Sequence, residues 1–402
     1  MDWENVFATR SSRMKASEIR ELLKLLDQPD IISFAGGIPD PALFPAEEFQ
    51  QAFTDTLTGE KRTDALQYSV SEGYAPLREW IAEEMEKLGI PCSIDNILIT
   101  SGSQQALDYL GKLLLSPNDT ALVTWPTYMG ALGAFNAYEP IYDRLIPNGN
   151  RSAAEYRDTA EENNSQVKFA YMSVDFANPT GETLDRPGRE RLLDLAEDMD
   201  IPVIEDAAYQ SLRYDGDPIP PILALDIDRN GHIDNTRTLY CGSFSKTLAP
   251  GLRVGWICAA QTAISKLVLM KQAADLHSSS INQIAIHDVA SKGFDQQVAK
   301  ISTAYSARRD CMLAALEEHM PEDVSWTKPE GGMFVWLTLP QNLDGADLLA
   351  SSIKTQRVAF VPGHAFYADG SNRNTIRLSF SQADEKTINE GIDRLGRLLK
   401  SV

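Results

Sequence analysis

One stretch of the chain combines a lysine, an arginine and several hydroxyl side chains, which are the groups most able to do chemistry. It is residues 240–256, YCGSFSKTLAPGLRVGW. Pro250 and Gly251 prevent a continuous helix, so Lys246 is predicted to lie on a loop between two strands. In a buried loop, desolvation and the nearby Arg253 would both disfavour the ammonium form of Lys246. A neutral amine of this kind can form a Schiff base with a carbonyl compound.

The same stretch offers ligands for a phosphate group. Ser243 and Ser245 supply hydroxyls and Arg253 supplies a guanidinium fork, which are groups that bind a phosphate dianion. A reactive lysine beside a phosphate site indicates pyridoxal phosphate as the cofactor. The spacing from Ser243 to Lys246 also matches the S-x-x-K of serine acyl-transferring penicillin-binding proteins. That chemistry requires K-T-G and S-D-N elements, which this sequence lacks, so we disfavour it.

Length, composition and charge narrow the class of protein. The chain has 402 residues, of which 43% are hydrophobic, enough for a large core in more than one domain. Its net charge of −20 argues against nucleic acid and anionic membranes as partners. No stretch approaches the ~20 apolar residues of a membrane span, and no secretory signal is evident, so we expect a cytoplasmic protein. The four cysteines have no C-x-x-C spacing, and we expect neither a disulfide framework nor a metal site.

From about residue 95, predicted strands alternate with helices, which is the pattern of a parallel α/β sheet. One predicted strand, over 252–258, follows the loop of Lys246. The helix predicted over 103–115 offers free N–H groups at its start, a second candidate for phosphate binding. Polar and aromatic side chains gather where the strands end, which is where ligands bind in such folds: Ser103, Tyr128, Asn178, Asp206, Tyr209, Ser243 and Lys246.

The two ends of the chain are predicted to differ from this middle part. A helix is expected from Ser17 to Leu26, and a Gly- and Pro-rich extended segment follows it. Strands are expected near residues 333–339, 358–361 and 375–380, with helices around them. We therefore divide the chain into an N-terminal arm with a mobile helix, a large α/β domain and a small α+β domain, at residues 1–45, 46–285 and 286–402.

The indicated cofactor sets further requirements. Its pyridine ring must hold a proton to withdraw electrons, and a buried carboxylate such as Asp206 would keep that proton in place. Asn178 and Tyr209 could donate to its phenolate oxygen, and Tyr128 could stack on the ring. Each of these residues also has an ordinary structural explanation, namely turn capping for the two polar residues and core packing for the tyrosines.

A substrate with an α-carboxylate would require an arginine fork. Two arginines lie close together in the predicted strand region near the C-terminus, Arg373 and Arg377. Arg377 alternates with the apolar Ile376 and Leu378, but a strand arginine is commonly just solvated. Spacing alone does not choose between the two.

Taken in order, these motifs resemble those of fold-type I, class I/II aminotransferases. The resemblance is strongest to the α-aminoadipate (LysN-type) and kynurenine aminotransferase II group. It covers nearly the whole chain, through the segments SFAGGIPDPALFP, LQYSVSEGY, SGSQQ, ANPTG, EDAAY, SFSKTLAPGLR and TIRLSFS. It implies a large pyridoxal-phosphate-binding α/β domain with a mostly parallel seven-stranded sheet. A smaller α+β domain would be built from the N-terminal arm and the C-terminus.

The resemblance also implies a role for each site residue. Lys246 would be the catalytic Schiff-base lysine, with Asp206 on the ring nitrogen and Tyr209 and Asn178 on the phenolate oxygen. The phosphate would be held by Ser103, Gln104, Ser243, Ser245 and Arg253, joined by Tyr68 from the partner subunit of a homodimer with shared active sites. The substrate would be bound by Arg377, at its α-carboxylate, and by Asn178, Gly37, Arg20 and Ser17.

Two positions depart from the pattern of this group. Ala177 stands where glutamine usually precedes Asn-Pro-Thr-Gly, and Ala207-Ala208 stand where Asp-Pro is frequent. Neither change removes a catalytic group, but both alter the surroundings of the cofactor and leave the substrate open.

We expect a ping-pong transaminase of amino-acid metabolism. It would move the amino group of an L-amino acid of 2-aminoadipate, aromatic or branched-chain type to 2-oxoglutarate or another 2-oxo acid. A racemase or a β-lyase on the same fold is the alternative. A non-enzymatic regulatory module is disfavoured, because the catalytic set is complete and no DNA-binding segment is evident.

Overall fold

The structure, a computed structural model, describes residues 1, 3–14, 30–149 and 151–401. In this part of the chain, seven strands form one sheet in the order β2-β8-β7-β6-β5-β3-β4. Of these strands only β8 runs antiparallel to its neighbours. The predicted seven-stranded, mostly parallel sheet is therefore confirmed. Its strands are β2 (Ile97–Thr100), β3 (Thr120–Thr124), β4 (Ile141–Leu145), β5 (Val167–Met172), β6 (Val203–Asp206), β7 (Thr238–Ser243) and β8 (Gly255–Cys258).

Helices cover both faces of this sheet, because successive strand residues point to opposite sides. In β2, Leu98 packs into a cluster with α5, α6 and α10, whereas Ile97 and Ile99 pack with α4 and α11 (Ser280–His319) on the other face. The helices around the sheet are α2 (Ala46–Thr58), α3 (Arg62–Leu66), α4 (Ala75–Lys87), α5 (Ser103–Leu114), α6 (Met129–Asn136), α7 (Ala153–Glu162), α8 (Arg186–Met199), α9 (Ile222–Asn230) and α10 (Gln261–Gln272).

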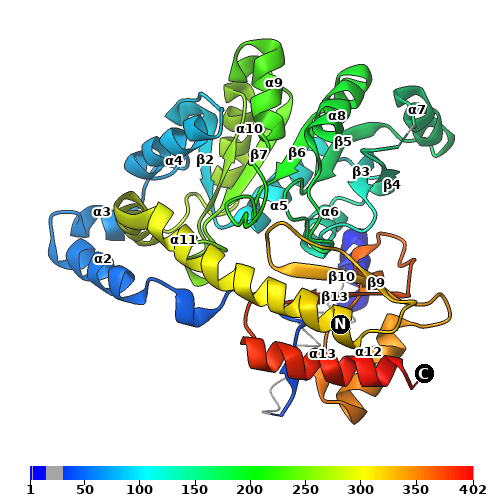
Figure 1. Ribbon diagram of the computed structural model, residues 1–402. Coiled ribbons are helices and arrows are strands. Elements are labelled where there is room, and N and C mark those ends of the chain that lie inside the picture. Colours follow the sequence, from blue (N-terminus) through cyan, green and yellow to red (C-terminus); the bar gives the residue numbers. More distant parts are fainter. Residues whose placement is uncertain (2, 15–29, 150, 402) are drawn as a thin grey trace.

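A second, antiparallel sheet lies below the large one in Figure 1, in the order β12-β13-β10-β9. The N-terminal arm joins the same part of the molecule, because β1 (Ile32–Ser33) pairs in parallel with β11 (Val358–Ala359). This arrangement confirms the smaller α+β part. Its other elements are β9 (Ser325–Trp326), β10 (Phe334–Thr338), β12 (Val361–Pro362), β13 (Thr375–Ser379), α12 (Gly345–Thr355) and α13 (Glu385–Leu399).

The long helix α11 (Ser280–His319) connects the two parts, as Figure 1 shows. Near its start Ile286 packs in the core of the large sheet, and near its end Met312 packs in the core of the small sheet. Gly293 has non-helical dihedral angles, so two helical segments meet there. The division at residues 45 and 285 remains our proposal for the domain boundaries.

Two predicted strands differ from the observed ones. The strand expected over 252–258 begins only at Gly255, because Pro250–Leu252 forms a 3-10 turn (η6) and Arg253 has a φ of 54°. The strand expected over 358–361 is divided, because β11 pairs with β1 whereas β12 pairs with β13. The helix expected from Ser17 to Leu26 lies outside the described residues. Within the described ranges, no helix is both long and apolar enough to cross a bilayer.

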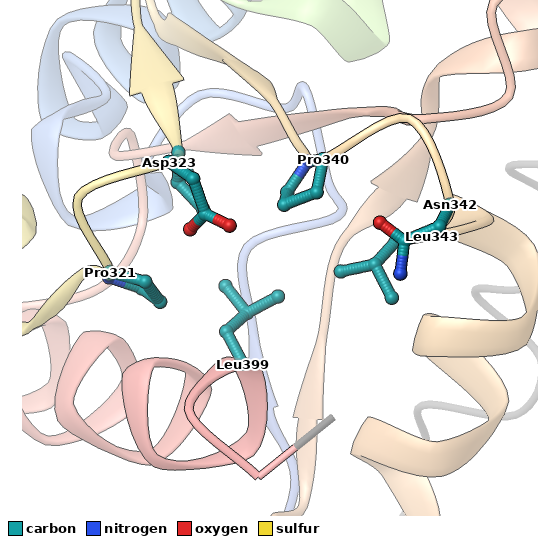
Figure 2. A pocket seen from close by; sticks show the side chains of 7 residues that line it. Pro321, Asp323, Pro340, Asn342, Leu343 and Leu399 are labelled. Carbon is teal, nitrogen blue, oxygen red and sulfur yellow. The ribbon is translucent and has the colours of Figure 1, made fainter.

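One cavity, of about 100 Å³, lies beside the C-terminal end of α13 (Figure 2). None of the residues predicted to do chemistry lines it, so it is not the predicted active site. Its lining is Pro321, Asp323, Val324, Pro340, Asn342, Leu343 and Leu399.

The other short 3-10 helices, besides η6, are η1 (Trp3–Val6), η2 (Thr9–Arg13), η3 (Pro41–Leu43), η4 (Ile94–Asn96), η5 (Ile233–Asn235) and η7 (Gly363–Phe366).

Candidate active site

The predicted site residues gather at one edge of the large sheet, where its parallel strands end. Asp206 ends β6, Ser243 ends β7, and Asn178 lies on the loop after β5. Lys246 lies on the loop that leaves β7 at this edge. Since β8 runs in the opposite direction, its first residues are at the same edge, and Arg253 lies two residues before Gly255, where β8 begins. The antiparallel strand β8 thus places Arg253 at the same edge of the sheet as Lys246.

Lys246 is partly buried and its amine is held in place. Its Nζ donates a hydrogen bond of 3.0 Å to the backbone oxygen of Gly37, which belongs to the N-terminal arm. Burial lowers the pKa of Lys246 to about 8, reinforced by the positive charges of Arg377 and Arg253 and opposed by Asp206. A substantial fraction of this amine is therefore neutral at mildly alkaline pH, as a nucleophile or a proton carrier requires.

Asp206 is a buried carboxylate at the end of β6. Its Oδ2 accepts a hydrogen bond of 2.8 Å from the hydroxyl of Tyr171, and its Oδ1 accepts one of 3.3 Å from the backbone N–H of Ala208. Burial raises the pKa of Asp206, although these donors and the charge of Lys246 oppose the rise. A further cationic donor, such as a protonated ring nitrogen, would stabilise this anion.

Arg377 reaches the same cluster from β13 of the small sheet. Its Nη1 donates to Oδ1 of Asn178 at 2.8 Å, and its Nη2 donates to the backbone oxygen of Ala35 at 2.8 Å. Nδ2 of Asn178 in turn lies 3.4 Å from the hydroxyl of Tyr209. Burial lowers the pKa of Arg377 to about 10, so the side chain is still a cation at neutral pH. The structure thus brings Arg377, Asn178 and Tyr209 together.

Two aromatic rings hold the guanidinium of Arg377. Its central carbon lies 4.2 Å from the ring centroid of Phe334 and 5.1 Å from that of Phe366. Its Nε is buried and has no hydrogen-bond partner among the described residues, which leaves a donor for an anion. Arg373, in contrast, lies on the surface and pairs with Asp344. Of the two arginines that the sequence left open, only Arg377 lies in this cluster.

The predicted phosphate ligands meet where β7, η6 and α5 approach one another. Nη1 of Arg253 lies 3.4 Å from Oγ of Ser245, and Oγ of Ser243 accepts a hydrogen bond of 3.1 Å from the N–H of Ser245. Gly102 has a φ of 80°, and a Cβ there would lie 2.4 Å from Nη2 of Arg253. Only glycine therefore allows Arg253 to approach the start of α5 this closely.

The start of α5 adds backbone donors to these side chains. Ser103 is its first residue, and the first N–H groups of a helix have no acceptor within the helix. The positive end of the helix dipole also favours an anion at this position. Gln104 donates from Nε2 to the backbone oxygen of Gly130 at 2.7 Å, and its Oε1 lies 3.5 Å from the hydroxyl of Tyr128. Gln104 thus connects the helix start with the tyrosine expected to stack on the cofactor ring.

The other predicted residues have varied positions. Gly37 is in the cluster, and a Cβ on it would lie 2.9 Å from the ring of Phe334. Tyr68 is 79% exposed, and its ring lies 6.0 Å from that of His277. Ser17 and Arg20 lie outside the described residues.

Three residues that contribute to the site were not predicted from the sequence. They are Tyr171, which donates to Asp206, and Phe334 and Phe366, which flank Arg377. The motif GGMF places Phe334 just after a glycine pair, which is a weak signal of a close approach. No sequence signal separates Tyr171 from an ordinary buried strand tyrosine.

Comparison with known proteins agrees with this geometry. A family model described as aminotransferase class I and II matches residues 29–395. The chain belongs to the class I and II aminotransferases. Aromatic-amino-acid aminotransferase 1 of Thermococcus litoralis is 43% identical, and the match covers all of this chain and 95% of that protein.

Two solved structures extend the comparison to the fold. LysN, an α-aminoadipate aminotransferase from Thermus thermophilus complexed with N-(5'-phosphopyridoxyl)-L-leucine, has 39% identity and a TM-score of 0.89, covering 100% of this chain and 99% of that one. Pyrococcus horikoshii kynurenine aminotransferase has 43% identity and a TM-score of 0.91, covering 100% and 98%. These findings confirm the resemblance and the aminotransferase fold that the motifs implied.

This aminotransferase depends on pyridoxal phosphate, and the described site fits that cofactor in two respects. The buried carboxylate of Asp206 suits a protonated ring nitrogen. The close approach of Arg253 to Gly102, at the start of α5, concentrates donors for a phosphate. The acyl-transfer, racemase and lyase alternatives are set aside by the family membership.

Proposed function

We propose that this aminotransferase moves the amino group of an L-amino acid of aromatic, branched-chain or 2-aminoadipate type to 2-oxoglutarate or another 2-oxo acid by a ping-pong mechanism. The observation that carries the proposal is the arrangement of Arg377 beside Lys246, with its Nε–H and the second hydrogens of its Nη atoms left for a substrate anion. Bound pyridoxal phosphate supplies the carbonyl group that accepts the amino group and the ring that withdraws electrons from the α-carbon.

The first task of the protein is to orient the substrate. Arg377 binds the α-carboxylate, and the rings of Phe334 and Phe366 fix the plane of its guanidinium. The hydrogen bonds from Arg377 to Asn178 and Ala35 fix its direction. With the carboxylate fixed, the bond from the α-carbon to its hydrogen can be turned toward Lys246.

The second task is to move a proton. Lys246, with a pKa of about 8, can take the α-proton of the substrate as a neutral amine and, with the cofactor bound, would act as the acid that returns this proton. Asp206 keeps the proton on the ring nitrogen, and Tyr171 keeps the Asp206 carboxylate in place. Burial raises the pKa of Tyr209 well above its ordinary value, so its hydroxyl remains protonated and can donate to the phenolate oxygen.

The relatives support the range of substrates. One similar protein is an aromatic-amino-acid aminotransferase, another is a kynurenine aminotransferase, and a third is an α-aminoadipate aminotransferase solved with a phosphopyridoxyl adduct of leucine. We therefore propose that aromatic, branched and acidic side chains can all be accommodated. Ser17 and Arg20 remain proposed contacts for the substrate side chain.

We also propose a homodimer whose active sites are completed across the interface. The segment around Tyr68 supports this, because it exposes three large apolar side chains within five residues: Leu66 (69%), Tyr68 (79%) and Val70 (56%). Contiguous exposed apolar surface of this kind is typical of a protein interface. Tyr68 of one subunit would then reach the phosphate site of the other. This part of the proposal would be contradicted if sedimentation analysis showed a monomer and that monomer had full transaminase activity.

A spectral titration tests the proposed reaction and its substrates together. The purified holoenzyme is mixed with single L-amino acids in the absence of any oxo acid, and the long-wavelength absorption of the cofactor is followed. We expect that absorption to be lost with aromatic, branched-chain and 2-aminoadipate substrates and restored by 2-oxoglutarate. Lys246→Ala serves as the control and should show no such loss. If no member of the panel changes the spectrum, the proposed substrates are wrong.

A further inference from the structure

An ion pair with a buried lysine lies beside the start of α5 and has no part in the mechanism above. Lys271, near the end of α10, is fully buried, and its Nζ lies 3.0 Å from both carboxylate oxygens of Asp275. The same Nζ donates to Oε1 of Gln105 and to Oγ of Ser278, each at 3.0 Å. The protons of the ammonium are therefore all used within the protein.

Gln105 connects this ion pair by hydrogen bonds to the turn that begins α5. Its Oε1 accepts from Lys271 and also from the backbone N–H of Ser101, at 2.8 Å. Its Nε2 donates to Asp275 at 2.8 Å. Lysine can only donate and a carboxylate can only accept, so the pair determines which end of the Gln105 amide faces Ser101.

Ser101 is the residue at which this network meets the phosphate ligands. Its hydroxyl lies 3.4 Å from Asp275 and 3.2 Å from the hydroxyl of Ser278. Its backbone oxygen accepts from Nη2 of Arg253 at 3.4 Å. Ser101 is thus held by Asp275 through its hydroxyl and contacted by Arg253 through its backbone oxygen. It immediately precedes Gly102 and the first N–H groups of α5.

The energetics favour a positioning role over a purely stabilising one. Burial lowers the pKa of Lys271, and the hydrogen bond and charge of Asp275 oppose the change. Burial alone would raise the pKa of Asp275, but donation from Gln105 and Lys271 lowers it. Lys271 is fully buried whereas the side chain of Asp275 is 30% exposed, and desolvation of the lysine offsets much of the attraction within such a pair. Its position beside a ligand site is therefore best explained by the groups that it orients.

We propose that Lys271 and Asp275 are positioning residues for the cofactor phosphate, because they fix Gln105 and Ser101 so that the start of α5 and Arg253 face one point. The inference rests on the proposed phosphate site and adds two residues that do not themselves touch the cofactor. It predicts that the pair matters for the phosphate group and not for the pyridine ring.

The test compares the affinity of the apoprotein for pyridoxal phosphate with its affinity for pyridoxal, which has the same ring and carbonyl but no phosphate. Lys271→Met and Asp275→Asn should each reduce the preference for the phosphorylated form by about tenfold, the effect of losing one hydrogen bond to a charged group. Lys266→Met is the matched control, because Lys266 is exposed on the same helix. This control should leave the preference unchanged.

The outcomes distinguish the ion pair from the phosphate site itself. The proposal is overturned if Asp275→Asn leaves the preference for pyridoxal phosphate over pyridoxal unchanged, whether both affinities stay the same or both fall equally. The side chain of Asp275 is 30% exposed, so this variant decides the question even if Lys271→Met does not fold. Arg253→Ala is measured in parallel. If Arg253→Ala alone loses the preference, the phosphate site stands and the role of the ion pair is refuted; if Arg253→Ala also keeps it, the phosphate site is wrongly assigned.

Discussion

Replacement of Arg377 by lysine should remove most of the preference for substrates that carry a carboxylate. Lysine keeps the positive charge, but it cannot bond Asn178 and Ala35 and still present a fork to the substrate. The loss of two hydrogen bonds between charged groups, together about 3–4 kcal/mol, corresponds to a decrease of roughly 10²- to 10³-fold in kcat/KM. The compact ammonium would also be desolvated between the rings of Phe334 and Phe366.

The assay is a single-turnover reaction with an L-amino acid and, separately, with the amine that lacks its carboxylate. In Arg377→Lys, kcat/KM for the amino acid should fall by the stated factor, whereas kcat/KM for the amine should change much less. Arg373→Lys is the control, since Arg373 pairs with Asp344 on the surface and should tolerate the change. An equal decrease for amino acid and amine would refute the assignment, because it would mean that Arg377 supports the site in general and does not bind the carboxylate.

Three further predictions concern the cofactor side of the site. In the apoprotein, the reactivity of Lys246 toward an amine-specific reagent should rise with pH through a midpoint of about 8, since the lowered pKa makes the amine neutral above that pH; a midpoint near the ordinary 10.5 would contradict this. Tyr171→Phe removes the 2.8 Å bond to Asp206 and should lower kcat roughly tenfold with little change in KM, and an unchanged kcat would show that Asp206 does not need this donor. Gly102→Ala places a Cβ 2.4 Å from Arg253 and should weaken binding of pyridoxal phosphate at least about tenfold in equilibrium dialysis, whereas wild-type affinity would argue against this phosphate site.

Much of the large sheet could be predicted because its strands are short apolar runs that are buried on both faces. Edges and interruptions were harder to predict. β4, with the sequence IYDRL, is an edge strand with only one fully buried residue, so its pattern is weak. The predicted strand over 358–361 is divided because its two halves pair with different strands. The choice of pairing partner depends on tertiary contacts, which local sequence does not encode.

In the candidate site, too, the positions of motifs could be predicted but the tertiary contacts between them could not. Lys246 and Asp206 follow strands in recognisable motifs, so their positions could be predicted from the order of those motifs. The contacts that tune them join distant parts of the chain: Tyr171 and Asp206 are 35 residues apart, and Asn178 and Arg377 are 199 residues apart. Tyr171 and Asp206 meet because β5 and β6 are adjacent strands of the large sheet, whereas Asn178 and Arg377 meet because the small sheet packs against the large one. No spacing rule within a segment indicates either pair.

The central claim is that Lys246 is the amine that binds the cofactor and carries the proton. Borohydride reduction of the holoenzyme, which fixes the carbonyl of a cofactor onto the amine that holds it, followed by peptide mass mapping, tests this claim most directly. We predict a single phosphopyridoxyl group on the peptide that contains Lys246, and no label in Lys246→Ala. A label on another lysine, such as Lys271, or a protein that is active but cannot be labelled, would contradict the account.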